Sequence, residues 1–275
     1  MSGLRQEFVQ RSITAICLSA VVVALVLFSP NLILNTFVFL LSLALFFEWM
    51  KVSKASRKKK IIFLLLFSSL ICCILGFGAL LEPIPIITML GITVWIVIAF
   101  QIFFREGRLS SSFSFTNFWI GLILISTFCL TCFQFVNGSR LFLLIAIFNV
   151  AIFDSGAYII GKNFGKNSFL PELSPNKTIE GLIGGLASSI VFVTLLYILI
   201  EEVSLKASIA LMLSIPFALC GDYFFSFLKR KANIKDTGSI LPGHGGLLDR
   251  VDSHLAAIPM TAFFSHLLYM LGSYF

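Results

Sequence analysis

The sequence predicts an all-α protein, a polytopic integral membrane helical bundle of about nine transmembrane helices in a single integrated membrane domain. Of its 275 residues 58% are hydrophobic and only 12% are charged, whereas soluble domains carry about 25% charged residues. The apolar residues occur in runs of about 20, the length of a helix that crosses a bilayer. The alternating segments of about ten residues that a membrane β-barrel needs are absent from the sequence.

The first five predicted spans form an N-terminal transmembrane scaffold over residues 1–140. The first is an apolar run from Ile13 to Phe28, and we expect it to be retained because no small-x-small cleavage site follows it. The others are expected at about 32–50, 61–81, 84–104 and 118–135. No acid or histidine lies within the third, fourth or fifth span. This half is therefore a candidate for scaffolding and for homodimer contacts.

A Cys-x2-Cys pair, Cys129 and Cys132, lies in the middle of the fifth predicted span. Neither a histidine nor a second cysteine pair is close to it in the sequence, so we interpret both residues as buried small side chains rather than metal ligands. The four remaining cysteines also fall in apolar runs and indicate no disulfide framework.

The second half, residues 141–275, is predicted to hold four spans and the catalytic site. The expected spans are 141–161, one that starts at Glu180, then 207–228 and 255–269. Asp154 lies inside the sixth span, and an ionisable group at membrane depth usually marks a site or a pathway. Gly181 and Gly185 have the spacing that packs two helices closely, so a packing role and a role in the site both stay open. The isolated histidines His254 and His266 are more typical of packing than of ligation.

The stretch from Asp222 to Asp252 concentrates the scarce charges of the chain. It holds four of the 13 acidic and five of the 20 basic residues. On a helix, Asp222, Ser226 and Lys229 would lie on one face. The glycines of residues 242–246 leave backbone N–H groups free to approach an anion. Carboxylates beside basic residues and glycines suit a metal-bound phosphate. The alternative is a charged loop that only fixes topology, but such loops need basic residues and not acids.

The same stretch carries a long pattern with fixed gaps: Ser226-x-Leu228-Lys229-Arg230-x4-Lys235-Asp236-x-Gly238-x2-Leu241-Pro242-x-His244-Gly245-Gly246-Leu247-x-Asp249-Arg250. This run resembles the signature of the phosphatidate cytidylyltransferases, the CDP-diacylglycerol synthases, at every specified position. A second run, from Asp154 through Lys162 and Lys177 to Gly181, resembles the same family. The resemblance covers residues 154–275 and is weak before them.

The resemblance implies that CTP and phosphatidate react to give CDP-diacylglycerol and pyrophosphate. A phosphate oxygen of the lipid would attack, so neither a covalent nucleophile nor a strong general base is required. The reaction needs neutralised charge and in-line positioning on the α-phosphorus, and Mg²⁺ is the expected cofactor because it prefers oxygen ligands. We expect Asp222 and Asp249 as metal ligands, with Asp252 and Asp236 as helpers.

The remaining candidate residues would contact the substrates. Basic side chains expected to hold phosphates are Lys229, Arg230, Lys235 and Arg250, with Lys162, Lys166 and Lys177 as a second wall. His244 completes the expected catalytic set, and the expected substrate-binding set also includes Ser226, Gly245, Gly246, Asp154 and Glu180. The expected partners are CTP, phosphatidate and membrane lipids, and not a nucleic acid.

Two other classes remain open. One is a different CTP-dependent membrane lipid enzyme, either a lipid kinase or an archaeal-type lipid cytidylyltransferase. A CDP-alcohol phosphotransferase is not favoured, because its Asp-Gly-x2-Ala-Arg pattern is absent. The other is an ion-coupled transporter, in which membrane carboxylates and broken helices are typical, although no internal repeat is evident.

The distribution of basic residues predicts the orientation. With nine spans and a cytoplasmic N-terminus, only Arg140 and Lys206 of the 20 basic residues fall outside. This asymmetry obeys the positive-inside rule. It predicts a multi-pass protein of a bacterial-type inner membrane, with both charged clusters in the cytoplasm and the C-terminus outside.

Overall fold

The computed structural model describes residues 19–53, 84–104, 118–171, 173–234, 236–238 and 245–272, together with residues 56, 58, 61, 62, 65 and 67. Its regular elements are, in chain order, the helices α2 (Asn31–Val52), α4 (Ile84–Phe104), α5 (Phe118–Gly138) and α6 (Arg140–Phe164), the strands β1 (Ser168–Leu170) and β2 (Ser174–Thr178), and the helices α7 (Ile179–Leu199), α8 (Leu205–Lys231) and α9 (Leu248–Gly272). A shorter apolar helix, Ser19–Phe28, precedes α2.

Within the described ranges seven helices are long and apolar enough to cross a membrane, α2 and α4 to α9. The protein is therefore an integral membrane protein, and the predicted all-α polytopic bundle is confirmed. The predicted number of nine spans is not confirmed. The first predicted span is described only from residue 19 onward, and most of the third, residues 61–81, lies outside the described residues.

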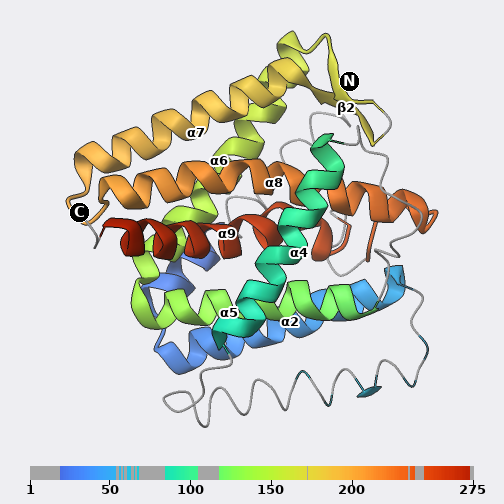
Figure 1. Ribbon diagram of the computed structural model, residues 1–275, viewed down its shortest axis with the longest axis horizontal. Coiled ribbons are helices and arrows are strands. Elements are labelled where there is room, and N and C mark those ends of the chain that lie inside the picture. The colour runs from blue at the N-terminus through green and yellow to red at the C-terminus, as the bar shows by residue number, and fades with distance from the viewer. Residues whose placement is uncertain are drawn as a thin grey trace.

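The helices lie in layers, with α7 at one edge and α2 at the other (Figure 1). Between them α8, α9 and α5 run roughly along the same axis, and α4 crosses in front of α8 and α9. In the apolar 18-residue stretch of α5, 78% of the residues are buried within the protein, whereas in that of α7 only 22% are buried. A helix that is apolar all round yet largely exposed suits contact with lipid. The core therefore lies around α5, and α7 is a peripheral helix.

The ends that carry the charged segments gather on one side of the bundle. The end of α8, the start of α9 and the β1–β2 hairpin all lie at the right of Figure 1. Arg140 belongs to the opposite side, where its guanidinium donates to the Ser29 carbonyl oxygen at 2.6 Å and to the Asn31 side chain. Arg140, one of the two basic residues expected outside, thus satisfies the carbonyl groups where the helix Ser19–Phe28 ends.

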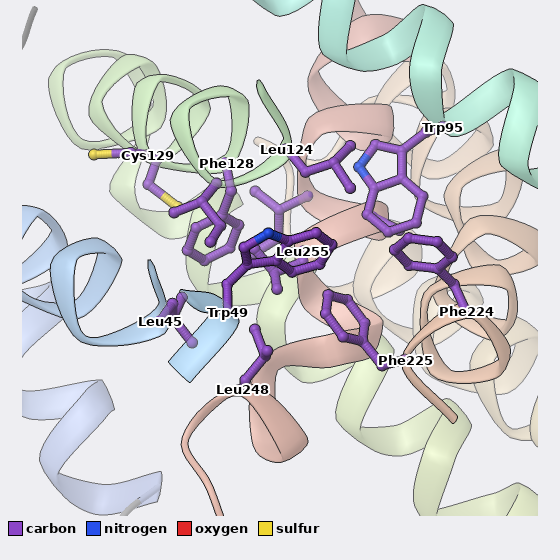
Figure 2. Packing of buried hydrophobic residues seen from close by; sticks show 14 of the residues in the cluster. Leu45, Trp49, Trp95, Leu124, Phe128, Cys129, Phe224, Phe225, Leu248 and Leu255 are labelled. Carbon is purple, nitrogen blue, oxygen red and sulfur yellow. The ribbon is translucent and has the colours of Figure 1, made fainter. Parts of the chain in front are cut away.

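The N-terminal helices pack directly on the C-terminal ones. Figure 2 shows Trp49 of α2 among side chains of α8 and α9, including Phe225 and Leu255. The Trp49 ring lies with its centroid 6.3 Å from that of Phe224 and 6.0 Å from that of Phe225. On α5, a Cβ atom at Gly121 would overlap the Trp49 ring. Glycine at this position therefore lets α2 and α5 approach closely, and both halves of the chain share one core.

Glycines also set the distance between α6 and α7. A Cβ atom on Gly181 would lie 2.8 Å from the Ala157 carbonyl oxygen, and one on Gly185 would lie 2.8 Å from that of Phe153. Real Cβ atoms do not approach so closely, so both positions require glycine for close helix packing. The packing interpretation of these two glycines is thus supported. Gly181 also lines the cavity described below, so its two expected roles coincide.

The antiparallel β1–β2 hairpin was not predicted, because this segment has the composition of a polar loop. It pairs Ser168 with Thr178 and Leu170 with Ser174. Phe169 attaches the hairpin to the bundle, with its ring centroid 6.4 Å from Phe103 of α4 and 6.1 Å from Tyr223 of α8. An aromatic side chain between two helices holds the short hairpin over their ends.

Helices α8 and α9 extend further than the sequence predicted. The last span was expected to begin at about residue 255, but α9 begins at Leu248. The first turns of α9 contain Asp249 and Asp252. Their charges lower the hydropathy of this segment, so the apolar pattern does not reveal where the helix begins. The expected helix over Asp222–Lys229 is confirmed, because α8 continues to Lys231.

Candidate active site

A cavity of about 580 Å³ lies between α6, α7, α8, α9 and β2. Its volume is in the range of small-molecule sites, about 300–1,000 Å³. It is lined by carboxylates, basic side chains and hydroxyl groups. Seven residues expected from the sequence line it: Asp154, Lys162, Lys177, Asp222, Asp249, Arg250 and Asp252. The structure thus brings the two charged clusters, which are far apart in the sequence, to one site.

Three carboxylates from three different helices interact with one another at this cavity. Asp154 comes from α6, Asp222 from α8 and Asp252 from α9, and each repels the others electrostatically. The Ser253 side chain hydrogen-bonds Asp154, and the Ser253 N–H donates to Asp252 at 2.9 Å. Grouping like charges costs free energy unless a cation neutralises them. We call these three residues the acidic trio.

Lys177 supplies a positive charge to the acidic trio. It extends from β2, and its ammonium group forms an ion pair with Asp222. The same ammonium lies 4.3 Å from the centroid of the Tyr223 ring, in cation–π contact. The next residue, Thr178, caps α7 by accepting a hydrogen bond from the Gly181 N–H at 3.1 Å. The cap and the hairpin together fix where Lys177 projects.

Asp249 also lines the cavity, but donors from the protein surround its carboxylate. Its Oδ1 accepts from Lys229 Nζ at 2.8 Å. Its Oδ2 accepts from the Thr237 N–H at 2.8 Å, the Thr237 hydroxyl at 3.0 Å and the Gly246 N–H at 3.0 Å. Asp249 thus joins α8, α9 and the connecting loop, whereas among the described residues the trio has fewer such donors. Its expected role as a metal ligand stays a prediction.

Two glycines of the glycine-rich segment, Gly245 and Gly246, lie against carboxylates of the chain itself. The Gly246 N–H donates to Asp249. Gly245 has a φ of +82°, a conformation that favours glycine. A Cβ atom on it would lie 3.2 Å from Asp236 and 3.3 Å from Asp249 oxygens. The expected contact of Gly245 and Gly246 with a substrate phosphate stays a prediction.

Several other expected site residues lie outside the cavity lining. Lys229 pairs with Asp249, and Ser226 and Arg230 belong to α8 without lining the cavity. Glu180 accepts from the N–H groups of Lys166 and Asn167, at 3.0 and 3.3 Å. It therefore attaches the loop after α6 to the start of α7.

Two expected catalytic residues, Lys235 and His244, lie outside the described residues. Asp236 is exposed and lies near Gly245 rather than among the cavity-lining residues.

The sequence interpretation missed several residues of the site. Tyr223, Ser253 and Asn176 line the cavity beside expected residues. Thr237, which donates to Asp249, occupies an unspecified position of the signature pattern. Glu48, near the end of the second predicted span, accepts a hydrogen bond from Thr237. The only sequence signal for Glu48 was an acid in an otherwise apolar run.

Mg²⁺ prefers oxygen ligands, which the cavity offers as carboxylates and hydroxyl groups. In the part of the chain that the structure describes, no three Asp, Glu, His or Cys side chains form a ready-made metal cluster. Mg²⁺ is commonly held by one or two carboxylates together with substrate phosphates and water. The grouped Asp222 and Asp252 fit that arrangement, with Asp154 beside them.

Cys129, Cys132 and His254 are used for packing. Cys129 and Cys132 are free and buried, and no described group of potential ligands surrounds them. The His254 ring contacts the Ile147 carbonyl oxygen at 3.3 Å, which links α9 to α6. These observations agree with the roles expected from the sequence.

Comparison with known proteins gives matches over the whole and over part of the chain. Phosphatidate cytidylyltransferase of Bacillus subtilis (strain 168) is 43% identical over 113 residues, which cover 40% of this chain and 42% of that protein. The protein of the same name from Staphylococcus haemolyticus is 42% identical over 122 residues, 43% of this chain and 46% of that protein. This chain thus matches less than half the length of these curated relatives. Residues 9–268 match the cytidylyltransferase family, and the chain therefore belongs to that family.

Proposed function

We propose that this protein is a phosphatidate cytidylyltransferase. It transfers the CMP unit of CTP to phosphatidate and releases pyrophosphate. A phosphate oxygen of the lipid forms a bond to the α-phosphorus, and the bond from that phosphorus to the bridging oxygen of the leaving pyrophosphate breaks. The similarity of this chain to relatives with that name supports the proposal.

The single observation that carries the proposal is the composition of the cavity. Carboxylates and basic side chains from three membrane helices, α6, α8 and α9, and from the β1–β2 hairpin converge on the cavity. A sugar or an apolar ligand would not need this combination. A nucleoside triphosphate needs both kinds of group. Its phosphates bind basic side chains, and the metal ion that accompanies it binds carboxylates.

In the proposed reaction the basic side chains bind and orient the substrates. Lys177, Lys162 and Arg250 line the cavity and bring the negatively charged triphosphate next to a negatively charged lipid phosphate. Because the attacking oxygen is already ionised, the protein supplies position and charge rather than a general base. Asn176 and Ser174 of β2 offer neutral hydrogen bonds beside the phosphate-binding groups.

Mg²⁺ is the proposed cofactor, with Asp222 as its first ligand and with Asp249 and Asp252 as the other candidates. When bound, it neutralises phosphate charge and favours departure of pyrophosphate. The role of the protein is to hold the carboxylates together. Asp222 and Asp252 do so from adjacent helices, which approach closely at Gly221, where a Cβ atom would lie 2.4 Å from the Asp252 carbonyl oxygen.

The location of the cavity suits a lipid substrate. Next to the cavity α6 exposes Tyr158 and Ile159, and α7 exposes Ile183. In a membrane these apolar side chains would face acyl chains, while the charged residues line the cavity. The lipid phosphate would then reach the cavity from the bilayer, and CTP would enter from the cytoplasm.

The test is transfer of isotope from CTP in detergent micelles that contain phosphatidate. Label at the α-phosphorus should appear in the lipid, and label at the γ-phosphorus should appear in pyrophosphate. A lipid kinase would instead move the γ-label to the lipid. A transporter would incorporate neither label, and either of those results would reject the proposal.

We further propose that the N-terminus and the cavity face the cytoplasm and that Phe275 lies outside. The positive-inside rule supports this orientation. A reporter enzyme fused after Phe275 should be active only in the form that requires export. Activity of a reporter that works only in the cytoplasm would show that Phe275 lies inside and would reject the proposed orientation.

A further inference from the structure

A buried acid from the N-terminal half contacts the signature loop. Glu48 of α2 has no exposed surface, and a buried carboxylate is costly unless it is paired or hydrogen-bonded. Its Oε1 accepts from the Leu247 N–H at 3.0 Å. Its Oε2 accepts from the Leu248 N–H at 2.7 Å and from the Thr237 hydroxyl at 3.1 Å. All of these donors are far from Glu48 in the sequence.

Two of these donors belong to the start of α9. The first N–H groups of a helix have no partner within the helix, and the positive end of the helix dipole favours an anion there. Glu48 supplies that anion from a neighbouring helix. Trp49, the next residue, packs against Phe225 and near Leu248 (Figure 2). The end of α2 is thus fixed against α8 and α9.

Thr237 links Glu48 to the cavity. Its hydroxyl lies within hydrogen-bond distance of Glu48 Oε2 and of Asp249 Oδ2, at 3.1 and 3.0 Å. A hydroxyl carries one hydrogen, so it serves one carboxylate at a time. Asp249 in turn pairs with Lys229. A continuous polar path therefore runs from α2 through the loop to α9 and α8.

The glycines of the loop make room for Glu48. A Cβ atom on Gly238 would lie 2.2 Å from Glu48 Oε1, and one on Gly246 would lie 2.6 Å from Glu48 Oε2. Both positions are specified in the signature pattern. Side chains there would displace the carboxylate, so glycine at these two positions lets the backbone approach Glu48 closely.

We propose that Glu48 is a positioning residue for the transferase reaction. It fixes the start of α9 and so sets where Asp249, Asp252 and Ser253, all within the first two turns of that helix, face the cavity. The inference rests on the proposed function and extends it to the half of the chain expected to be only a scaffold. Glu48 itself does not line the cavity.

Glu48→Gln is the informative substitution, because it keeps the size of the side chain and removes one acceptor. Both oxygens of Glu48 accept hydrogen bonds in the wild type. Whichever way the amide of the Glu48→Gln side chain is turned, its NH₂ group would therefore face an N–H donor. The start of α9 should shift and misalign the reacting groups. We expect kcat to fall at least about tenfold, since small misplacements cost that much or more, with a smaller change in KM for CTP.

Two controls separate positioning from general stability. Glu201→Gln makes the same chemical change in the exposed turn between α7 and α8 and should leave kcat unchanged. Hydrogen exchange should become faster in peptides that cover residues 236–250 of Glu48→Gln and stay unchanged in α5. If Glu48 were only a packing residue, exchange would rise throughout the core, and kcat per folded protein would equal that of the wild type.

Thr237→Val removes the hydroxyl between Glu48 and Asp249 without a change of charge. This variant tests the positioning role even if Glu48→Gln does not fold. It should lower kcat in the same direction, and the double variant should be less than additive because the two residues act through one hydrogen bond. Retention of more than half of wild-type kcat by the folded variants, with unchanged exchange, would overturn the inference. A wild-type protein that forms no CDP-diacylglycerol would reject the proposed function instead, and the exchange measurement would still decide the role of Glu48.

Discussion

Two sets of carboxylates lie close together in this protein and differ in their partners. The acidic trio, Asp154, Asp222 and Asp252, repel one another, and Lys177 forms an ion pair with one of them. Glu48 and Asp249 instead accept, between them, hydrogen bonds from one lysine, one hydroxyl and four backbone N–H groups. Satisfied carboxylates hold a structure together, whereas carboxylates short of partners are ready to bind a cation. We therefore expect the trio to bind the cation directly, and Glu48 and Asp249 chiefly to hold the loop and the start of α9 in place.

Removal of divalent metal should have the largest effect on activity. EDTA should abolish CDP-diacylglycerol formation, and added Mg²⁺ should restore it, because the triphosphate needs charge neutralisation before an anionic lipid can attack. In the absence of substrates, EDTA should change the melting temperature by no more than a few degrees. Glu48 and Asp249 are held by hydrogen-bond donors of the protein and do not depend on a metal ion for their partners. Full turnover in excess EDTA would contradict the proposed use of the trio.

Asp222→Asn and Asp249→Asn should separate the two sets. Each should lower kcat at least about 10²-fold, the scale of losing one electrostatic stabiliser. Only Asp249→Asn should also destabilise the fold, by about 1–3 kcal/mol, because it removes the charged partner of the partly buried Lys229 and weakens the hydrogen bonds to the loop. Asp222→Asn relieves repulsion within the trio, so thermal unfolding should change little. Equal losses of stability in both variants would remove the distinction.

Lys177→Met should have a moderate effect. It keeps the apolar contact with Tyr223 and removes the ammonium that neutralises Asp222. We expect kcat/KM for CTP to fall about tenfold, a loss of about 1.4 kcal/mol of transition-state binding. Lys206→Met, exposed at the start of α8, is the matched control. A normal kcat/KM in Lys177→Met would show that the cavity does not use this lysine.

The smallest effect on activity is expected at the α6–α7 contact made by Gly185, which does not itself line the cavity. Gly185→Ala places a Cβ atom 2.8 Å from the Phe153 carbonyl oxygen, and overpacking of this kind costs about 1–3 kcal/mol. The melting temperature should fall, with kcat per folded protein nearly normal. Gly138→Ala, where a Cβ atom would meet nothing within 4 Å, should unfold like the wild type.

Much of the site could be predicted from the sequence because its charges are rare in an apolar chain. Asp154, Asp222 and Asp252 stand out for that reason, and all three line the cavity. Asp249 stands out equally, yet its environment differs from theirs. The partners of a carboxylate come from other helices, and spacing along one helix does not reveal them.

The sequence by itself determined that this is a membrane helical bundle, since runs of about 20 apolar residues can satisfy their backbone groups in lipid only as helices. It also predicted, through the two runs that resemble the family signature, segments whose residues line the cavity. Only the tertiary structure decided that Glu48 belongs to that chemistry. The Thr237 hydroxyl and the Leu247 and Leu248 N–H groups lie about 190–200 residues from Glu48, and the packing of Trp49 on α8 brings them together. A hydrogen bond requires two groups to be close in space. For groups so far apart in the sequence, the packing of the helices decides whether they meet.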